Sequence, residues 1–389
     1  TAPATLAGDI DSTNTAGLTK LGSGTLVLAG ANTYTGTTTI TAGALQIGNG
    51  GSAGSLGASG TTSNTGLLVF NRNDSYGGPV SGLIFGTGTV ALSNGVLTLS
   101  GPNTYTGGFT LNSGTVVVGN AAALGGATGR LTINGGALDV TAGSNVTTGA
   151  YPQSWANSFA FLGSGSLNLG AGAVTLSASP TLTVGGTGPL VVGGIISGAQ
   201  QLTKSGSGRL VLSGANTFSG GFTLNSGTVV VGASTALGAT AGAITINGGV
   251  IEVVNTNLIT GSNNQIWNNS FEFLGSGSWN TGTGAVTLAG VSPMTLTVNG
   301  TGPLFVTGTV SGAQQLTKSG SGRLVLSASN TFSGGLVLSD GTLALGNNGA
   351  LGTGTFTVSG GMLDVPAGNV TWSNNNAQSW NGDFVYLGT

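Results

Sequence analysis

The sequence contains no cysteine and no histidine among its 389 residues. The lack of cysteine excludes disulfides and thiol nucleophiles, and the lack of histidine excludes imidazole bases and the most common zinc ligands. Charge is scarce as well, since seven Lys and Arg side chains stand against nine Asp and Glu side chains. The chain therefore has no basic stripe for nucleic acid or anionic membrane surfaces. We expect no metal, no cofactor, no nucleic-acid partner and no catalysis.

Long apolar runs are also absent. No stretch of about 18 apolar residues could cross a bilayer as a helix, so we expect no membrane insertion by this segment. Glycine is abundant instead, at 77 residues, beside a hydrophobic fraction of 39%. Glycine in a helix interior costs about 1 kcal/mol relative to alanine, which argues against helices. Short clusters such as "TLVLAG" and "LTING" alternate aliphatic and small polar residues, so the sequence predicts an all-β protein.

One phrase occurs four times, as "GSGTLVLAGANTYTG" from residue 22, "SNGVLTLSGPNTYTG" from 93, "GSGRLVLSGANTFSG" from 206 and "GSGRLVLSASNTFSG" from 320. The asparagine of the phrase recurs at nearly equal intervals, except that the first interval is shorter. A tryptophan outside the phrase recurs at the same long interval. These structural markers are Asn32, Asn103, Asn216, Asn330, Trp155, Trp267 and Trp380. A fixed interval of this kind predicts a long repeat of about 113 residues. The first copy is shortened, and the copies divide the chain as 1–89, 90–201, 202–315 and 316–389.

A finer period lies inside the long repeat, with alternating steps of about 19 and about 22 residues, which is the length of one turn of a parallel β-solenoid. The aliphatic residues that mark it are Leu26, Leu45, Leu67, Leu210, Val229 and Ile251. We expect three short strands per turn, joined by Gly, Asn and Ser corners. The first long repeat is shorter by about 42 residues, which equals two such turns. One turn cannot offset the entropy of ordering its own backbone, so we expect one continuous solenoid over residues 1–389.

The stretch "GSGTLVLAGANTYTGTTTITAGALQIGNGG" resembles the passenger-associated transport repeat of autotransporter-type secreted proteins, and "WNGDF" at 380–384 resembles another element of such passengers. The resemblance implies a right-handed parallel β-helix that is exported across the outer membrane and is extracellular or held at the bacterial cell surface. It implies no particular activity. Both ends of the sequence lie in mid-repeat, so we expect a slice of a longer array whose partners are neighbouring repeats of the same chain.

Carboxylates are the remaining candidates for chemistry. Asp139, Glu252 and Asp364 occupy one repeat position, but at five to six turns apart they would be on the order of 25 Å from each other. Glu252 and Glu272 are separated by about one turn, so they are expected on adjacent turns at about 5 Å, where two carboxylates could act as acid and base or bind Ca²⁺. Ala160 stands where Glu272 does in the neighbouring repeat. We therefore interpret the carboxylates as solvated and keep Glu252 with Glu272 as the alternative site.

Lysine recurs just before the phrase and arginine recurs within it. Lys20, Lys204 and Lys318 precede it, and Arg209 and Arg323 follow the last two lysines by five residues. A basic pair of this kind could bind acidic glycans, but the second copy replaces both residues with Ala91 and Val96. We interpret these side chains as solvated charges that discourage lateral aggregation.

The polar and aromatic markers have two interpretations each. The asparagines are expected to form side-chain to backbone turns while Tyr34, Tyr105, Phe218 and Phe332 cover the corner, although such rings could also stack on sugars. The tryptophans could fill one bulky corner per long repeat or form a periodic carbohydrate site. The threonine-rich "TTTIT" at 37–41 would suit an ice-binding ladder, but later copies read "GFTLN" and "GLVLS", which we interpret as a broken ladder.

The sequence as a whole favours a rigid, neutral, extracellular rod that serves as a surface fibre, sheath component or adhesin stalk. A glycan-binding or glycan-cleaving β-helix is the first alternative, with host or matrix glycans as partners. A self-associating filament or sheath subunit is the second. Because few groups titrate, we expect the stability of the rod to vary little between about pH 4 and 9.

Overall fold

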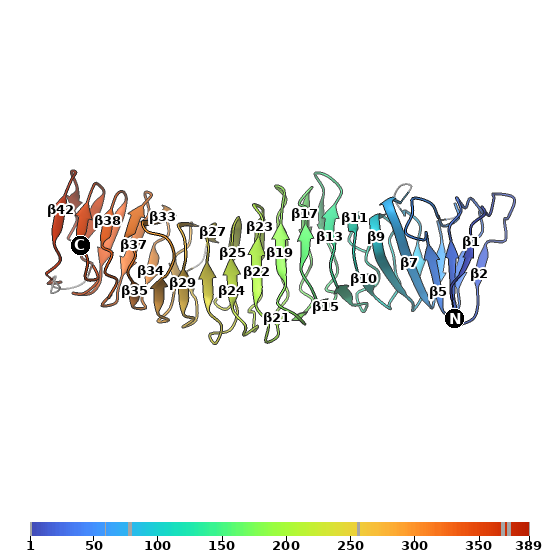
Figure 1. The fold of residues 1–389 in the computed structure, drawn as a ribbon, viewed down its shortest axis with the longest axis horizontal. Helices are drawn as coiled ribbons and strands as arrows, with labels where there is room; N and C mark the ends of the chain where they lie inside the picture. Colours follow the sequence, from blue (N-terminus) through green and yellow to red (C-terminus); the bar gives the residue numbers. More distant parts are fainter. Residues whose placement is uncertain are drawn as a thin grey trace. The chain divides into compact units, whose positions relative to one another are not determined.

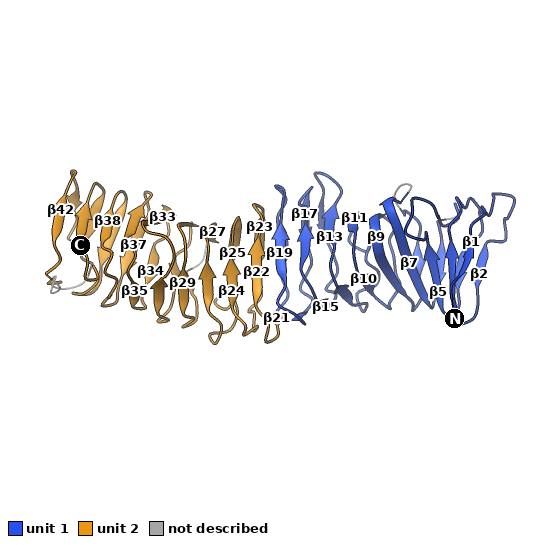
Figure 2. Cartoon of the chain, in the orientation of Figure 1, with its two compact units in different colours: residues 1–195 blue, residues 196–389 orange. Residues whose placement is uncertain are grey.

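The computed structural model describes residues 2–58, 60–76, 80–254, 257–366, 370–371 and 375–388. Short strands follow one another along this part of the chain and pair in parallel from one turn to the next (Figure 1). This is the parallel β-solenoid that the sequence predicted. The described residues include no helix, and so none that is long and apolar enough to cross a membrane. Two compact units, residues 1–195 and 196–389, are described separately (Figure 2).

The first unit contains short strands and two longer ones, β7 and β9. Its strands are β1 (Ala4–Leu6), β2 (Leu18–Lys20), β3 (Thr25–Leu28), β4 (Thr38–Ile40), β5 (Ala44–Ile47), β6 (Thr62–Asn64), β7 (Leu67–Ser75), β8 (Ile84–Phe85), β9 (Thr89–Leu99), β10 (Phe109–Leu111), β11 (Thr115–Val118), β12 (Leu131–Ile133), β13 (Ala137–Val140), β14 (Asn145–Thr147), β15 (Gln153–Trp155), β16 (Phe159–Phe161), β17 (Ser166–Asn168), β18 (Val174–Leu176), β19 (Thr181–Val184) and β20 (Leu190–Val192). β2, β4, β6 and β8 form a sheet of their own.

The second unit repeats this construction. Its strands are β21 (Ile196–Ser197), β22 (Leu202–Ser205), β23 (Arg209–Leu212), β24 (Phe222–Leu224), β25 (Thr228–Val231), β26 (Ile244–Ile246), β27 (Val250–Val253), β28 (Leu258–Ile259), β29 (Gln265–Trp267), β30 (Phe271–Gly275), β31 (Trp279–Asn280), β32 (Val286–Leu288), β33 (Met294–Gly300), β34 (Leu304–Val306), β35 (Val310–Gly312), β36 (Leu316–Ser319), β37 (Arg323–Leu326), β38 (Leu336–Leu338), β39 (Thr342–Leu345), β40 (Phe356–Val358), β41 (Met362–Asp364), β42 (Gln378–Trp380) and β43 (Val385–Tyr386). Some turns contribute three strands, such as β26 to β28, and others two, such as β24 and β25, where the sequence predicted three throughout.

The strand registers give the length of a turn directly. In the second unit Leu210 pairs with Val229 and Val229 with Ile251, so both predicted steps of the turn period are confirmed there. In the first unit Leu45 pairs with Leu68, so the expectation that Leu67 continues this column was wrong by one residue. The strand begins "LLVF", and its second leucine is the buried one.

The interior consists of columns of side chains that stack from turn to turn. Leu202, Phe222 and Ile244 form one such column, and all three are fully buried. Their strands alternate inward apolar and outward polar residues, because successive side chains of a strand point to opposite faces. Corners where the chain passes close to the neighbouring turn use glycine. At Gly227, which has a φ of +71°, an added Cβ would lie 2.2 Å from the carbonyl oxygen of Gly206.

The long repeat is not always a whole number of turns. In the second unit one copy of "GSGRLVLS" forms β23, in a sheet with β25 and β27, whereas the next copy forms β37, in a different sheet with β39 and β41. The tryptophan markers shift in the same way, since Trp267 lies on β29 and Trp380 lies on β42 of another sheet. Within this unit, equivalent residues of consecutive repeats therefore face different sides of the solenoid.

Candidate functional site

The recurrent lysines are buried, so the interpretation that they are solvated was wrong. Lys204 and Lys318 are fully buried on β22 and β36, and Lys20 is 7% exposed on β2. The Lys204 ammonium donates to the carbonyls of Ser205 at 2.9 Å and Gly206 at 2.8 Å, and to Ser226 on the next turn at 3.0 Å.

The other two lysines make the same set of three contacts. Lys20 donates to the carbonyls of Leu21, Gly22 and Ala42, and Lys318 to those of Ser319, Gly320 and Asp340, at distances between 2.6 and 3.1 Å. We name each lysine with the three carbonyls around it a lysine corner. A sharp corner turns backbone carbonyls toward the interior, and an ammonium with three N–H donors satisfies them.

The second phrase copy needs no lysine because it has no corner at this point. There the chain continues as one strand, β9, through the region where β22 ends and β23 begins in the third copy. Leu92 pairs with Leu111 as Lys204 pairs with Leu224, so the buried Leu92, and not Ala91, stands in the lysine position. The sequence alone suggested Ala91 for this position because the second copy has one residue fewer than the third copy between the lysine position and the following strand segment.

Burial has an electrostatic consequence for two of the lysines. Loss of solvation lowers the pKa of Lys204 and of Lys318 to about 8, and for Lys318 the nearby Asp340 opposes this shift. The carbonyl oxygens around each ammonium supply partial negative charge where water is excluded. The lysine corner is therefore a structural cation site that the protein fills with its own side chain.

Two of the recurrent acidic residues form ion pairs with arginines of the repeat. Arg209 forms a two-pronged ion pair with Glu252, one contact being 3.0 Å, and Arg323 pairs with Asp364. Each arginine reaches across an intervening strand, β25 or β39, to the second strand beyond its own. The Asp364 side chain is 0% exposed and that of Glu252 is 14% exposed, so the expectation of solvated carboxylates was wrong.

Asp139 completes this comparison in the first unit. Val96 stands where the arginine would be, and the buried Asp139 carboxylate accepts hydrogen bonds from the backbone N–H and the hydroxyl of Ser164, at 3.0 and 2.7 Å. Every acid at this repeat position therefore has a partner within the protein. None of the three is available as a free general acid or base.

Glu252 and Glu272 lie on neighbouring strands, β27 and β30, but not in register. Glu252 pairs with Leu274, and Glu272 pairs with Val250. Glu272 accepts a hydrogen bond from the amide of Asn299 at 2.8 Å, while Glu252 is held by Arg209. Within the described chain no group of three or more acidic side chains could hold a metal ion. Each of the two carboxylates therefore makes its own structural contact, and the two do not act as a pair.

The asparagine markers connect three successive turns rather than forming local turns alone. The side-chain oxygen of Asn216 accepts from the backbone N–H of Ile196 at 2.8 Å, and its amide donates to the carbonyl of Ala236 at 2.6 Å. The same pair of contacts recurs at Asn32, Asn103 and Asn330. All four side chains are buried, at 5% exposure or less.

The aromatic markers of the phrase are interior residues, which excludes them from stacking on sugars. Tyr34, Tyr105, Phe218 and Phe332 are all fully buried. The Tyr34 hydroxyl lies 2.7 Å from the hydroxyl of Thr38, whereas the Tyr105 hydroxyl has no hydrogen-bond partner among the described residues. Burial accordingly raises the pKa of Tyr105 well above its ordinary value.

Two of the tryptophans fill the interior. Trp155 and Trp267 are fully buried, and each donates its indole N–H to the glutamine two residues earlier, at 3.1 and 3.0 Å. Each also packs edge-on against a phenylalanine four residues later. Trp380 is 61% exposed because, among the described residues, no strand follows β42 in its sheet. The buried alternative is therefore the correct one for Trp155 and Trp267, although they stand on β15 and β29 and not in corners.

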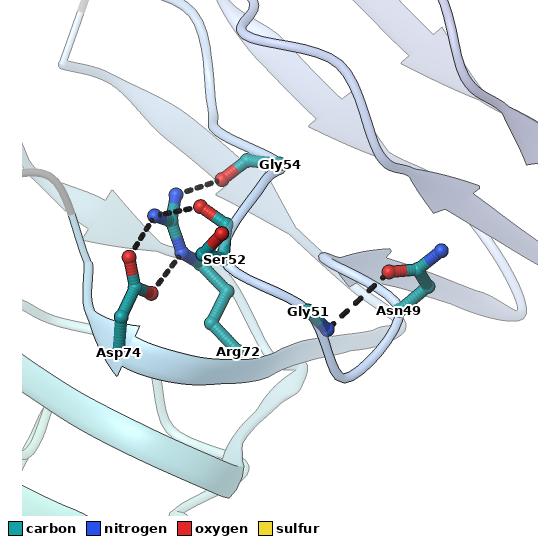
Figure 3. A network of polar contacts seen from close by, with 6 residues as sticks. All are labelled: Asn49, Gly51, Ser52, Gly54, Arg72 and Asp74. Carbon is teal, nitrogen blue, oxygen red and sulfur yellow. Dashed lines mark hydrogen bonds and ion pairs between the residues drawn. The ribbon is translucent and has the colours of Figure 1, made fainter.

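One polar cluster, formed around Arg72 and Asp74, was not predicted from the sequence. Arg72 on β7 binds Asp74 through two nitrogens and donates to the carbonyls of Ser52 and Gly54, in a loop that also holds a contact between Asn49 and Gly51 (Figure 3). The guanidinium lowers the pKa of Asp74. The run "NRND" was the available signal, since it places an arginine two residues from an aspartate.

A hollow of about 280 Å³ lies beside this cluster. Its lining includes Arg72, Leu56 and Tyr76, and the Tyr76 hydroxyl accepts from the backbone N–H of Leu56 at 2.7 Å. Burial raises the pKa of Tyr76 to about 12. The Arg72 and Tyr76 polar groups are thus engaged with the protein itself, and the cluster pins the loop against β7.

Comparison with known proteins identifies the repeat. Residues 18–47, 93–118, 202–231 and 316–345 match the passenger-associated transport repeat. The chain is also similar to the adhesin BmaC autotransporter of Brucella suis biovar 1 (strain 1330), with 30% identity over 434 aligned positions. That similarity covers 96% of this chain but only 12% of the length of the relative. No solved structure matches the chain.

Each matched segment contains one copy of the phrase, and each begins within a strand, namely β2, β9, β22 or β36. The resemblance inferred from the sequence is thereby confirmed. Passengers of this kind are exported across the outer membrane to the bacterial cell surface, which is the location that the sequence predicted. The chain therefore carries four copies of the passenger-associated transport repeat.

Proposed function

We propose that this chain is a structural element of an adhesin-type passenger, and that it acts by length and rigidity without catalysis. The observation that supports the proposal is the position of the repeated residues. The lysines before the phrase and the asparagines and ring residues within it point inward, and the lysines and asparagines connect successive turns. The adhesin relative supports the same role.

Cleavage of glycans is the weaker alternative on this evidence. Glycosidases need two carboxyl groups that flank one bond, with one of them free to give a proton. Glu252 and Glu272 are each occupied by a different partner, Arg209 and Asn299. We expect no new reducing ends when the purified chain is incubated with neutral and acidic polysaccharides.

The experiment that tests the structural role changes the length of the chain. Deleting residues 156–267 joins Trp155 to Asn268 and removes one long repeat, and the deletion should leave a folded β-rich protein. If residues 1–389 form one continuous solenoid, electron microscopy should show particles shorter by about 25 Å. A deletion that unfolds the whole chain, or leaves the particle length unchanged, would contradict the proposal.

Self-association into fibres is a second candidate role, and one recurrent feature favours it. Leu162, Leu274 and Leu387 stand at the same repeat position, and each is at least 40% exposed. Leu274 and Val254 line an open hollow of about 350 Å³. Exposed apolar groups at a fixed repeat position are typical of protein contact sites. Sedimentation velocity of the chain and of Leu274→Ser tests this role, because only a lateral contact through Leu274 would be lost.

A further inference from the structure

The outward face of one sheet in the second unit carries two columns of polar side chains. The first column is Thr203, Thr223, Thr245, Ile266 and Thr287, which the strand registers place in line on β22, β24, β26, β29 and β32 (β24 and β29 are labelled in Figure 1). The sequence "GFTLN" was interpreted as a break in a threonine ladder. The register instead places the threonine of "GFTLN", Thr223, inside the column. The hydroxyl column is therefore interrupted only at Ile266.

The second column stands two residues further along each strand and consists of amides joined to each other. Asn247 donates to the side-chain oxygen of Asn225 at 2.8 Å, and Asn268 donates to that of Asn247 at 2.8 Å. Asn225 in turn donates to the hydroxyl of Ser205 at 3.0 Å. Each amide keeps one N–H and part of its acceptor capacity, because an amide group offers two donors and one oxygen with two lone pairs. The amides are held in a fixed orientation before any ligand arrives.

The threonine hydroxyls of the first column, unlike the amides of the second, are not hydrogen-bonded to each other. Thr223 is only 9% exposed, yet no described residue makes a hydrogen bond with its hydroxyl, and the same is true of Thr203 and Thr245. A hydroxyl that is nearly enclosed and still reaches the surface is expected to pair with water or with a ligand. The two columns also contain no ionisable side chain, so the face favours a ligand without formal charge.

The dimensions of the face select among ligands. Five rungs at about 4.8 Å and a width of two residues give a strip on the order of 150 Å², far below the roughly 800 Å² that each partner buries in a stable protein complex. A second copy of the chain would therefore gain too little area here. The narrow width also disfavours a crystal plane such as ice, which needs an extended surface.

We propose that this strip binds a neutral, extended, β-1,4-linked hexose chain that lies parallel to the solenoid axis. The sugar units of such a chain advance by nearly the same length as one strand spacing of about 4.8 Å. Each sugar would then meet one threonine hydroxyl and one asparagine amide. The first unit contains a similar strip, with Thr110, Thr132, Ser154 and Thr175 in register and Asn134 donating to Asn112 at 2.8 Å. The inference goes beyond the proposed structural role and does not depend on it.

The test uses the full chain with cellohexaose and mannohexaose as neutral probes and heparin as the charged probe, by isothermal titration and affinity electrophoresis. Thr245→Val removes one hydroxyl without changing shape, and the double variant Thr245→Val with Asn247→Leu also breaks the amide ladder. The matched control is Thr357→Val, which changes a half-buried threonine on β40, in a sheet that contains neither strip. Thr245→Val alone keeps the test valid if the double variant fails to fold.

Wild type and Thr357→Val should bind a neutral hexasaccharide equally. Thr245→Val should weaken binding by about fivefold and the double variant by about fiftyfold, since each 1.4 kcal/mol is tenfold in affinity. Heparin should not bind. The proposal is overturned if neither neutral probe binds the wild type, if Thr245→Val binds as well as Thr357→Val, or if the variants instead abolish ice shaping or self-association. Loss of glycan binding with an unchanged particle length would leave the structural role intact.

Discussion

The ammonium of Lys204 lies 3.0 Å from the carbonyl oxygen of Ser226, one turn of the solenoid further along the chain. Together with two carbonyls of its own corner, this contact joins the corners of adjacent turns through a fully buried charge. The same arrangement at Lys20 and Lys318 makes the lysine part of the repeat itself. A position that the sequence presents as a surface charge is thus a connection between turns.

Replacing this lysine should destabilise the second unit. In Lys204→Met the methionine fills similar space but leaves three buried carbonyls without donors, and each such group costs about 1 to 3 kcal/mol. Release of the buried charge offsets part of this cost, so we expect a net loss of about 2 kcal/mol, measured by urea unfolding followed by circular dichroism. The reciprocal control is Leu92→Lys, which buries a charge where no corner exists and should also destabilise. A Lys204→Met protein as stable as wild type would disprove the role of the lysine corner.

Stability should rise as the pH increases from about 8 to 9.5. The folded-state pKa of Lys204 and Lys318 is about 8, below the ordinary value of 10.5, so the unfolded chain binds more protons across this interval. Stability increases with pH wherever the unfolded state binds more protons, and two such lysines give a gain of about 3 kcal/mol. The expected constancy between pH 4 and 9 should therefore end near pH 8.

The interval stops at pH 9.5 because the tyrosines act in the opposite direction. Burial raises the pKa of Tyr105 and Tyr76, so the folded state retains protons that the unfolded state loses above about pH 10. Thermal melts at pH 7.5, 8.5 and 9.5 isolate the lysines. The double variant Lys204→Met with Lys318→Met should lose the rise, and an equal rise in that variant would assign it to other groups.

Tyr105→Phe should leave the protein as stable as wild type or more stable by about 1 kcal/mol. The substitution removes a buried hydroxyl that has no partner in the described structure, and phenylalanine already occupies this position as Phe218 and Phe332. Tyr34→Phe is the matched control, because it breaks the contact with Thr38 and should cost about 1 kcal/mol. Chemical denaturation of both variants gives the comparison, and a larger loss for Tyr105→Phe would show that its hydroxyl is satisfied.

Loss of the two arginines should have unequal effects. Arg323→Met leaves the Asp364 carboxylate buried at 0% exposure without its ion-pair partner, at an expected cost of about 3 kcal/mol. Arg209→Met leaves Glu252 14% exposed, where water can replace part of the lost interaction, and should cost about 1 kcal/mol. Urea midpoints of the two variants measure the difference. Equal losses would mean that burial of the acid does not set the strength of the pair.

Much of the fold could be predicted from the sequence because stacking imposes a short, regular period. The steps from Leu210 to Val229 and Ile251 are the register itself, since parallel turns place equivalent side chains over each other. Register slips by one residue were not predictable where two apolar residues adjoin, as at Leu67 and Leu68. Periodicity identifies the face of a strand only when its neighbours differ in polarity.

The side-chain roles were less predictable. Lysine, aspartate and glutamate are usually exposed, so the sequence favoured solvated interpretations of Lys204, Asp364 and Glu252. Partners that lie one or two turns away along the chain, such as Ser226 for Lys204, reverse that preference. Such partners cannot be identified without the register of the corners.

The sequence by itself determined that this protein is an all-β solenoid, because its composition and its short period permit few other ways to bury its aliphatic residues. The resemblance to the passenger-associated transport repeat came from the repeated phrase. Only the tertiary structure decided which polar residues are interior. Corners turn backbone carbonyls and N–H groups inward, and Lys204 and Asn216 are buried because those groups need partners where water is absent. The tertiary structure also placed Thr223 and Asn225 in outward columns, since alignment across turns depends on the length of every corner between them.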